Sequence, residues 1–563
     1  MIRGMAFFFF AILKAGCSRL SCDASMALAG SPRVLAILAL ASVVFFSPAT
    51  AQNPATSVAV DASANQHAIN PNIYGGAWFA TSDLIATNAP LNRLGGNNTS
   101  DYNWQQDAMN LDEDWYWESY LEDGPPVVAG AMIDNEIQLT HAANVGSQPM
   151  VTIPMLPYIA KVGPDATTGA ASLWSFSVAK YGAQVGCGSL DAADPYQSDA
   201  GSGCLSGGAF VDNDPSDAYV PNSVAIEKAW VQHLVSKWGD STTATGVKYY
   251  ILDNEPSIWS GTHRDVHPSA ETYDELYNDI VAYAGAIRAV DPNAVIVGPE
   301  EWSWWAMYES GLDQRNGTGA GSDYATHSNT YYYPYLLQKL YAYKQANGVD
   351  LINILSVHCY TDASSNFNVA TRELWDPNYV DPNWYGQVGL NGSVIEWIPL
   401  MKQWVNQYYP GLGIACTEYN WDDESTLSGA TTEADLLGIF GYYGYDMASI
   451  FGAPVKPTYL SMQMYRNYDG SLSTFGDNSV AATVANPDNL SSYAAVRSSD
   501  GALTVMVINK QTGSTPVTVS LANFSTTGSA QAYQISSATQ TSINSLGSVA
   551  VANNSVSATV PSQ

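Results

Sequence analysis

Short apolar runs alternate with longer amphipathic segments from Ile73 to Asp469, and this alternation limits the fold more than any other feature of the chain. The short runs are nearly continuous in apolar residues, as parallel strands are when both of their faces are buried. Repeated strand–helix units of this kind predict a (β/α)8 barrel. The expected strands are Ile73–Phe79, Leu91–Gly95, Met150–Leu156, Val247–Leu252, Ala294–Gly298, Ile352–Tyr360, Gly413–Glu418 and Ala448–Phe451. The expected helices include Val224–Trp238, Ala270–Val290, Tyr335–Ala346, Ile395–Tyr408 and Glu433–Tyr443.

After Asp469 the composition changes to Ser, Thr, Asn and Gly, with short strand-like stretches between turns. This pattern is typical of an all-β sandwich. Val58–Ala62 is also strand-like, and we expect it to join the sandwich before the barrel begins. The predicted organisation is therefore an α/β protein: an N-terminal strand region (52–72), a (β/α)8 barrel (73–469) and a smaller β-sandwich domain (470–563). The expected sandwich strands are Ala494–Ser498, Leu503–Asn509, Val517–Ala522, Ala530–Ile535 and Val549–Ala552.

The N-terminal segment 1–51 has the pattern of a signal peptide. Arg33 precedes the apolar run Val34–Phe46, and small residues follow up to Ala51. This run is too short to span a membrane comfortably, and the Ala-x-Ala end predicts cleavage after Ala51. The leader is long, and Met26 would give a signal of ordinary length. We expect a secreted protein, extracellular or periplasmic, without a membrane segment in its mature form.

The formal net charge of −31 repels phosphate backbones and argues against nucleic-acid binding. The chain also contains 16 Trp and 35 Tyr residues. Aromatic side chains of this kind either fill a core or stack on flat apolar faces of sugars. An exported, acidic and Trp-rich barrel favours a polysaccharide as partner.

Two glutamates stand where predicted strands end, which is the active-site face of such barrels. Glu255 follows the run ending at Leu252 and precedes Pro256, which cannot continue a strand. Glu418 ends the strand that begins at Gly413. A pair of carboxylates facing each other can cleave a glycosidic bond, one as proton donor and one at the anomeric carbon. Asn254 could hold the sugar 2-hydroxyl, whose hydrogen bonds strengthen in the transition state.

Longer motifs narrow the class, because together they resemble glycoside hydrolase family 44. The resemblance implies an endo-acting β-1,4-glucanase or xyloglucanase with a barrel and a β-sandwich built from both chain ends. It also implies a retaining mechanism in which Glu255 is the acid/base and Glu418 the nucleophile, with no cofactor for catalysis. The motifs are Arg93–Trp104, Asp114–Tyr116, Leu252–Pro256 with Trp259 and His263, Val357–Tyr360, Thr417–Asn420, Tyr465–Gly470 and Phe475–Asp477.

Further candidates for substrate contact lie on or just after strand ends, where each one could equally belong to the core. His358 and Tyr360 alternate on one strand, so both side chains can point to the same side. His263 and His267 are four residues apart, but no His-Glu-x-x-His pattern supports zinc. We expect His263 to support the cleft through a hydrogen bond. The substrate-contact candidates are Asn97, Trp104, Asn254, Trp259, His263, Trp302, His358, Tyr360 and Trp421.

Asp212, Asp214 and Asp217 could ligate a structural Ca²⁺ ion, although a solvated acidic turn is the other interpretation. Cys187 and Cys204 lie in a Gly/Ser/Asp-rich stretch and could form a disulfide in an oxidising compartment. Cys359 and Cys416 sit inside apolar strands, so we expect buried free thiols there.

The sequence therefore predicts a monomeric, secreted, retaining endo-β-1,4-glucanase acting on cellulose-like β-glucan, with xyloglucan as a further substrate. A mannanase or a xylanase on the same barrel is the alternative among enzymes. A non-catalytic carbohydrate-binding surface protein is the alternative outside them, but such a protein has no use for a proton donor opposite a nucleophile.

Overall fold

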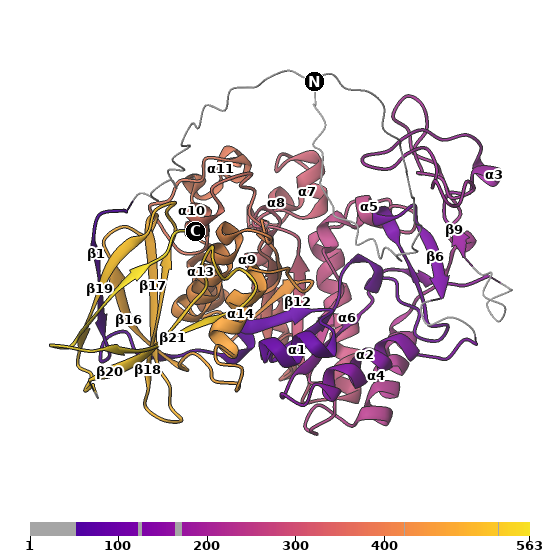
Figure 1. The fold of residues 1–563 in the computed structure, drawn as a ribbon. Helices are drawn as coiled ribbons and strands as arrows, with labels where there is room; N and C mark the ends of the chain where they lie inside the picture. Colours follow the sequence, from indigo (N-terminus) through magenta and orange to yellow (C-terminus); the bar gives the residue numbers. More distant parts are fainter. Residues whose placement is uncertain (1–51, 122–125, 164–171, 422, 527) are drawn as a thin grey trace, which may run out of the picture.

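The computed structural model describes residues 52–121, 126–163, 172–421, 423–526 and 528–563, so the expected signal peptide lies outside the described residues. Eight parallel strands form a closed barrel in the order in which they occur along the chain, beginning with β3 (Figure 1). This confirms the predicted (β/α)8 barrel. The barrel strands are β3 (Gly75–Ala77), β4 (Leu91–Leu94), β7 (Gln148–Ile153), β11 (Tyr249–Leu252), β12 (Val295–Glu301), β13 (Ile354–His358), β14 (Gly413–Tyr419) and β15 (Met447–Phe451).

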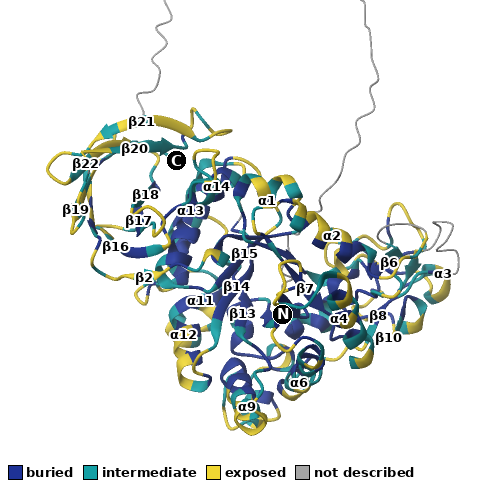
Figure 2. Cartoon of the chain, turned by 90° about the horizontal axis from the view of Figure 1, so that it is seen from below, coloured by how far each residue is buried: buried dark blue, intermediate teal, exposed yellow. Residues whose placement is uncertain are grey.

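The barrel strands are buried on both faces, which is why they read as continuous apolar runs (Figure 2). Helices surround them, and polar caps define where several of these helices begin. Ser223 accepts a hydrogen bond from the Ile226 amide at the start of α4, and Thr272 does the same for Glu275 in α6. None of the described helices combines the length and apolar character that crossing a bilayer requires. The longer helices are α2 (Ala131–Ala142), α4 (Val224–Trp238), α6 (Tyr273–Val290), α9 (Tyr332–Asn347), α12 (Trp397–Tyr408), α13 (Leu427–Tyr443) and α14 (Thr458–Arg466).

The loops after β4 and β7 carry small extra sheets that the sequence patterns did not indicate. One is three-stranded, with β5 (Ala108–Asn110), β6 (Glu118–Leu121) and β9 (Leu173–Trp174). The other pairs β8 (Tyr158–Ala160) with β10 (Tyr219–Pro221). In the same region the structure joins Cys187 and Cys204 in a disulfide, the pairing that the sequence suggested.

The C-terminal all-β region contains a seven-stranded sheet and a separate pair of strands, and the predicted N-terminal strand lies inside the larger sheet. β1 (Thr56–Asp61) runs antiparallel to β16 and parallel to β19. In Figure 1 this indigo strand lies among the orange to yellow strands of the C-terminal region. The N-terminal strand is therefore an integral part of this sheet. The other strands of the region are β2 (His67–Ala68), β16 (Asn478–Val484), β17 (Leu490–Val496), β18 (Leu503–Asn509), β19 (Thr515–Ala522) and β22 (Ser555–Val560), with β20 (Ser529–Gln534) pairing β21 (Asn544–Ala550).

Helix α13 joins the barrel to this β region through a buried polar contact. Gly438 leaves room for the ring of Tyr493, because a Cβ atom there would lie 2.1 Å from a ring carbon. The Tyr493 hydroxyl donates to Asp435 at 2.7 Å. The Lys510 ammonium group lies 2.6 Å from the same carboxylate, and both side chains are almost fully buried.

Replacing Lys510 by Met should strongly destabilise the protein, because the substitution leaves the Asp435 carboxylate buried without its cation. Removing one partner of a buried ion pair lowers the free energy of unfolding by about 3–5 kcal/mol. The free energy of unfolding in urea measures this cost. Lys180→Met is the matched control, since it breaks an exposed pair with Asp217 and should leave the free energy of unfolding almost unchanged. Equal losses in the two variants would contradict the expectation.

Candidate active site

Polar side chains from five barrel strands meet at the carboxyl ends of those strands, the face where barrel active sites lie. β4 supplies Arg93 and β12 supplies Glu300. β13 ends in His358, and β14 carries Glu418. Asn254 and Glu255 follow β11 directly, and Tyr360 follows β13. The two glutamates predicted from the sequence thus lie in one cluster.

Glu418 is held on both of its carboxylate oxygens. The Arg93 guanidinium donates to Oε2 at 2.6 Å, and the Tyr360 hydroxyl donates to Oε1 at 2.7 Å. Burial and the charge of Glu418 raise the pKa of Tyr360 well above its usual range, so the phenol remains protonated and keeps donating. A cation and a hydroxyl donor together stabilise the anionic form of Glu418.

Glu255 has an unusual backbone conformation, which directs its side chain into the same cluster. Its φ is 47° and that of Asp253 is 58°, a left-handed conformation that costs a non-glycine residue about 1–3 kcal/mol. The Glu255 amide donates to the Glu300 carbonyl at 3.0 Å. Asp253 accepts hydrogen bonds from the Met155 and Leu156 amides and so fixes the turn. Strain of this kind persists only where the surroundings enforce it.

His358 bridges the two predicted catalytic carboxylates. Its Nδ1 atom lies 2.7 Å from Oε1 of Glu255 and 3.8 Å from Oε2 of Glu418, and the ring is fully buried. Burial alone would lower the pKa of His358, but the nearby carboxylates of Glu418, Glu255 and Glu300 outweigh it and raise the pKa to about 10. The imidazole is therefore positively charged at neutral pH.

Glu300 is a third carboxylate beneath this pair and has no exposed surface. Its Oε2 accepts from Arg93 at 3.1 Å and lies 3.3 Å from Nε2 of His358, and Oε1 accepts from the Thr417 hydroxyl at 2.8 Å. Burial disfavours the ionised form, but His358 and Arg93 together lower the pKa of Glu300 to about 2. Glu300 is therefore the fixed anion that orients the two cations.

The side chains of Asn254 and Asn97 form a hydrogen bond at the edge of the cluster. Asn254 Oδ1 accepts from Arg93 at 3.0 Å, and its amide nitrogen donates to Asn97 Oδ1 at 3.0 Å. Asn97 is partly exposed, and so is Tyr360. The structure thus gathers Asn97, Asn254, His358 and Tyr360 around the two glutamates, while their contacts with a sugar remain predictions.

The tryptophans predicted from the sequence have different surroundings. Trp259 is buried and donates to the Asn254 carbonyl, and Trp421 is buried and donates to the Cys359 carbonyl. Trp104 stacks on Trp230 of α4. Trp302 is partly exposed, as is Trp104, and it stacks on Trp384 with ring centroids 6.3 Å apart. Contacts of these four tryptophans with a sugar remain predictions.

His263 is fully buried, with its Nδ1 atom 2.9 Å from Asp112 Oδ1, so its effect on the site is indirect. The three aspartates proposed for calcium are otherwise engaged or exposed. Asp217 pairs with Lys180, and Asp214 caps the Ser216 amide. Asp212 is exposed. Among the described residues, groups with carboxylate or imidazole ligand atoms within 4.8 Å of one another do not include this triad.

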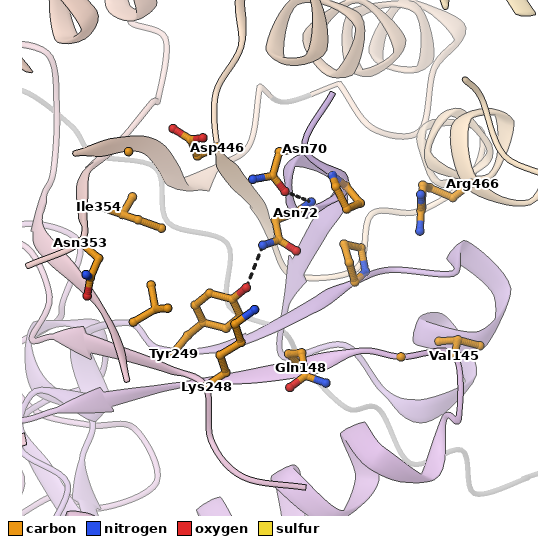
Figure 3. A pocket seen from close by; sticks show the side chains of 15 residues that line it. Asn70, Asn72, Val145, Gln148, Lys248, Tyr249, Asn353, Ile354, Asp446 and Arg466 are labelled. Atoms are coloured by element: carbon orange, nitrogen blue, oxygen red, sulfur yellow. Dashed lines mark hydrogen bonds between the residues drawn. The ribbon is translucent and has the colours of Figure 1, made fainter. Parts of the chain in front are cut away.

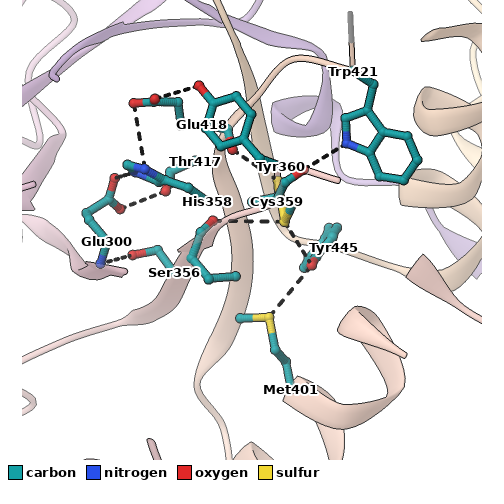
Figure 4. Close-up of a disulfide and its surroundings, with 12 residues drawn as sticks. Glu300, Ser356, His358, Cys359, Tyr360, Met401, Thr417, Glu418, Trp421 and Tyr445 are labelled. Atoms are coloured by element: carbon teal, nitrogen blue, oxygen red, sulfur yellow. Dashed lines mark hydrogen bonds and ion pairs between the residues drawn. A yellow bond between two sulfur atoms is a disulfide. The ribbon is translucent and has the colours of Figure 1, made fainter. Parts of the chain in front are cut away.

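Cys359 and Cys416 form a disulfide in the structure, so the expectation of free thiols was wrong (Figure 4). Cys359 directly follows β13, and Cys416 lies in the middle of the neighbouring parallel strand β14. Pairing of these strands brings the two Cα atoms to 5.8 Å from each other. Cys359 lies between His358 and Tyr360, and Cys416 lies two residues before Glu418. The link therefore ties together the two strands that carry these site residues.

Sequence reasoning did not identify Glu300 as a member of the site, and it named Arg93 only inside a motif. The missed signal for Glu300 resembles the one that marked Glu255 and Glu418, because the predicted strand Ala294–Gly298 runs into Glu300 and Glu301. Arg93 lies one residue before the carboxyl end of β4. Charged residues at the ends of several barrel strands were therefore the usable signal.

A cavity of about 640 Å³ opens at the other end of the barrel, lined by residues at the amino ends of the strands (Figure 3). Asn72 donates to the Tyr249 hydroxyl at 2.9 Å there, and Lys248 lies over the Tyr249 ring. In barrels of this type, residues at this end contribute to stability and the chemistry lies at the opposite end. The cavity is thus separate from the carboxylate cluster.

The lowered pKa of Glu300 predicts that the free energy of unfolding decreases at low pH. Its pKa of about 2 lies below the ordinary value of 4.5, so its contribution is complete above pH 4.5 and disappears as pH falls through about 2. The two pKa values correspond to roughly 3 kcal/mol. Urea unfolding should therefore show Glu300→Gln less stable than wild type by roughly 3 kcal/mol above pH 5, with the gap closing toward pH 2.

The exposed Glu113 provides the control, because Glu113→Gln should leave the pH profile unchanged. A stability difference between wild type and Glu300→Gln that stays constant from pH 6 to pH 2.5 would show that Glu300 is not ionised in the native protein.

Comparisons with known proteins agree with this geometry. The sequence model of glycoside hydrolase family 44 matches residues 108–363. The crystal structure of CelM2, a bifunctional glucanase-xylanase from a metagenome library, shares 46% identity and a TM-score of 0.84, covering 91% of this chain and 98% of that one. A Paenibacillus polymyxa xyloglucanase of family 44 shares 27% identity and a TM-score of 0.72, covering 90% and 97%.

Endoglucanase A of Paenibacillus lautus is 29% identical over 502 residues, which is 82% of this chain and 65% of the relative's own length. This chain thus spans about two thirds of that curated relative. The two solved structures, in contrast, are covered almost completely, through the barrel and the β region alike. The chain belongs to glycoside hydrolase family 44.

Proposed function

We propose that the chain is a retaining endo-β-1,4-glucanase that uses Glu255 and Glu418. The observation that carries the proposal is the separation of these carboxylates. One oxygen of each lies within 4.8 Å of the other and of an imidazole nitrogen of His358. Retaining glycosidases place their carboxyl groups about 5–5.5 Å apart, whereas inverting enzymes need about 6.5–9.5 Å to admit a water molecule. The short separation favours retention.

The contacts of Glu418 fit the role of nucleophile. A nucleophile must be ionised when the substrate arrives, and Arg93 and Tyr360 both stabilise the anion. These two contacts also fix the carboxylate so that one oxygen can approach the anomeric carbon. Arg93 is itself held by Glu300, so the orientation of the nucleophile depends on a buried anion that takes no part in bond formation.

Glu255 is left as the acid/base. Its side chain is 14% exposed, compared with 9% for Glu418, and its hydrogen bond is to His358. A general acid must be protonated when the substrate arrives, and the assigned role requires this of Glu255.

The reaction then has two steps. Glu255 gives its proton to the glycosidic oxygen while a Glu418 oxygen attacks the anomeric carbon, which breaks the glycosidic bond and forms a covalent glycosyl ester. Glu255, now a base, takes a proton from water, and that water releases the sugar from Glu418 with net retention. Asn254 is held by Arg93 and Asn97, and we assign it the contact with the sugar 2-hydroxyl.

The substrate follows from the relatives and from the aromatic surface beside the site. The relatives are described as a glucanase-xylanase, a xyloglucanase and an endoglucanase, which supports a β-1,4-linked glucan chain and internal cleavage. Trp302 and Trp384 form a partly exposed stacked pair that can pack on sugar rings. Xylan is the main rival substrate, because one relative is a xylanase as well. Mannan remains the other alternative.

Glu255→Ala and Glu418→Ala should separate the two roles. Without its acid the enzyme should lose about 10²–10⁴-fold on polysaccharide but still form the glycosyl ester from an aryl glycoside with an acidic phenol, which needs no proton. Azide should then replace water and give a β-glycosyl azide, identified by NMR. Glu418→Ala should fail on both substrates, since no ester can form.

Any azide product from Glu418→Ala should have the inverted α configuration. Reversal of the two patterns would exchange the assigned roles. Near-full activity in both variants would remove Glu255 and Glu418 as the catalytic pair and, with them, the proposed mechanism.

Internal cleavage should lower the viscosity of a soluble β-1,4-glucan well before much reducing sugar appears. A parallel panel of xyloglucan, mannan and xylan measures which backbone the enzyme prefers by reducing-end release. Early release of only glucose or cellobiose at nearly constant viscosity would contradict the endo mode. Faster release from mannan or xylan than from glucan would replace the glucanase assignment.

Export is the remaining part of the proposal, and it rests on the segment before Gln52 alone. A mature N-terminus at Gln52 in the exported protein would be its direct evidence, and retention of the leader in that protein would contradict it.

A further inference from the structure

Three carboxylates outside the catalytic cluster converge on one point in the segment between β13 and α12. Asp362 follows the strand end that carries Tyr360, Glu373 lies in the short helix η8 (Thr371–Leu374), and Asp381 precedes α11 (Trp384–Val388). One oxygen of each lies within 4.8 Å of the others. Glu373 is 1% exposed and Asp381 is 4% exposed, so the group is not a solvated surface patch.

In each of these carboxylates, one oxygen accepts hydrogen bonds from nearby amide or hydroxyl groups. Asp362 Oδ2 accepts from the Tyr385 amide at 2.5 Å, and Glu373 Oε1 accepts from the Thr361 hydroxyl at 3.1 Å. Asp381 Oδ1 accepts from the Asn383 amide at 2.6 Å and from the Gly386 amide at 3.2 Å. The positions of all three side chains are therefore fixed by local contacts.

The second oxygen of each carboxylate is buried and accepts no hydrogen bond from the described residues. These atoms are Oδ1 of Asp362, Oε2 of Glu373 and Oδ2 of Asp381. A buried carboxylate oxygen without a partner is costly unless a cation or a proton compensates it. Three such atoms in one place indicate a missing positive charge.

The other two groups of potential metal ligands among the described residues each contain a histidine. His358 and Arg93 compensate Glu255 and Glu418. His263 lies against Asp112 in the group that also includes Asp101. Among the ion pairs of the described residues, none involves Asp362, Glu373 or Asp381. The nearby Arg372 is instead paired with Asp376 and Asp488.

We propose that Asp362, Glu373 and Asp381 bind a Ca²⁺ ion. The available ligand atoms are all carboxylate oxygens, which suit a hard cation rather than zinc with its nitrogen and sulfur ligands. Ca²⁺ accepts irregular sets of six to eight oxygen ligands, whereas Mg²⁺ demands near-ideal octahedral geometry and keeps its water. Backbone carbonyls and water can complete the set around three fixed carboxylates.

The ion would organise one wall of the catalytic site. The Tyr385 hydroxyl donates to the Tyr360 carbonyl at 3.2 Å, and Tyr360 in turn donates to Glu418. Trp384, next to Tyr385, stacks on Trp302. The segment that the ion holds together thus contacts Tyr360, which is the hydrogen-bond donor to Glu418, and it supplies Trp384 to the aromatic pair with Trp302.

The proposal is tested on the full chain, stripped with EDTA and dialysed into metal-free buffer at pH 7.5. Isothermal titration with CaCl2 should show one bound Ca²⁺ per chain that is missing in Glu373→Gln and bound at least tenfold more weakly in Asp381→Asn. Addition of about 1 mM CaCl2 should raise Tm for wild type but not for Glu373→Gln, because ligand binding stabilises only the native state that holds the site. MgCl2 should give a smaller shift.

Asp212→Asn is the matched control, since it removes one carboxylate from the exposed triad and should bind Ca²⁺ like wild type. The proposal is overturned if wild type and Glu373→Gln bind the same amount of Ca²⁺ with the same affinity. It is also overturned if wild type binds none and Glu373→Gln is the more stable protein in EDTA, because protons shared between the carboxyl groups would then be the compensation. Both readouts are independent of glycosidase activity.

Discussion

The Arg93 guanidinium, buried between Glu300 and Glu418, is the interaction on which the rest of the site depends. A buried guanidinium is costly to desolvate, and only well-placed carboxylates compensate that cost. Arg93 therefore fixes the relative positions of β4, β12 and β14, the three strands that supply the three side chains. His358 adds a second cation to the same arrangement and connects it to Glu255. The predicted nucleophile and acid/base are thus placed by charges that take no part in bond making.

The barrel brings these charged side chains together because all of its parallel strands end on one face. Neighbouring strands deliver side chains a fixed distance apart, and the disulfide between Cys359 and Cys416 ties two of them together. The left-handed backbone at Glu255 then turns that carboxylate toward His358, which regular strand geometry would not do. In the proposed mechanism, rigidity and local strain both hold the two carboxylates close enough for a covalent intermediate to form between enzyme and sugar.

The loops that follow the strands decide how the site is bounded. Insertions after β4 and β7 build small sheets on one side, and the segment between β13 and α12 builds the other side with Trp384 and Tyr385. That segment has little regular structure, so its order depends on side-chain contacts and, in our proposal, on a bound cation. Substrate preference among β-glycans would be decided here, because the carboxylate cluster itself recognises only the reacting bond.

The sequence by itself determined the barrel, the C-terminal β region with its N-terminal strand, and Glu255 and Glu418 as strand-end carboxylates. These follow from local patterns: apolar periodicity, a proline after a strand, and acidic residues where a strand ends. Only the tertiary structure decided that Glu300 joins the carboxylate cluster, that Trp259 is buried, and that Cys359 and Cys416 meet. It also moved the candidate calcium site from Asp212 and its neighbours to three carboxylates spread over some twenty residues. Such contacts depend on strand register and loop path, which join residues far apart in the chain and leave no periodic signal in the sequence.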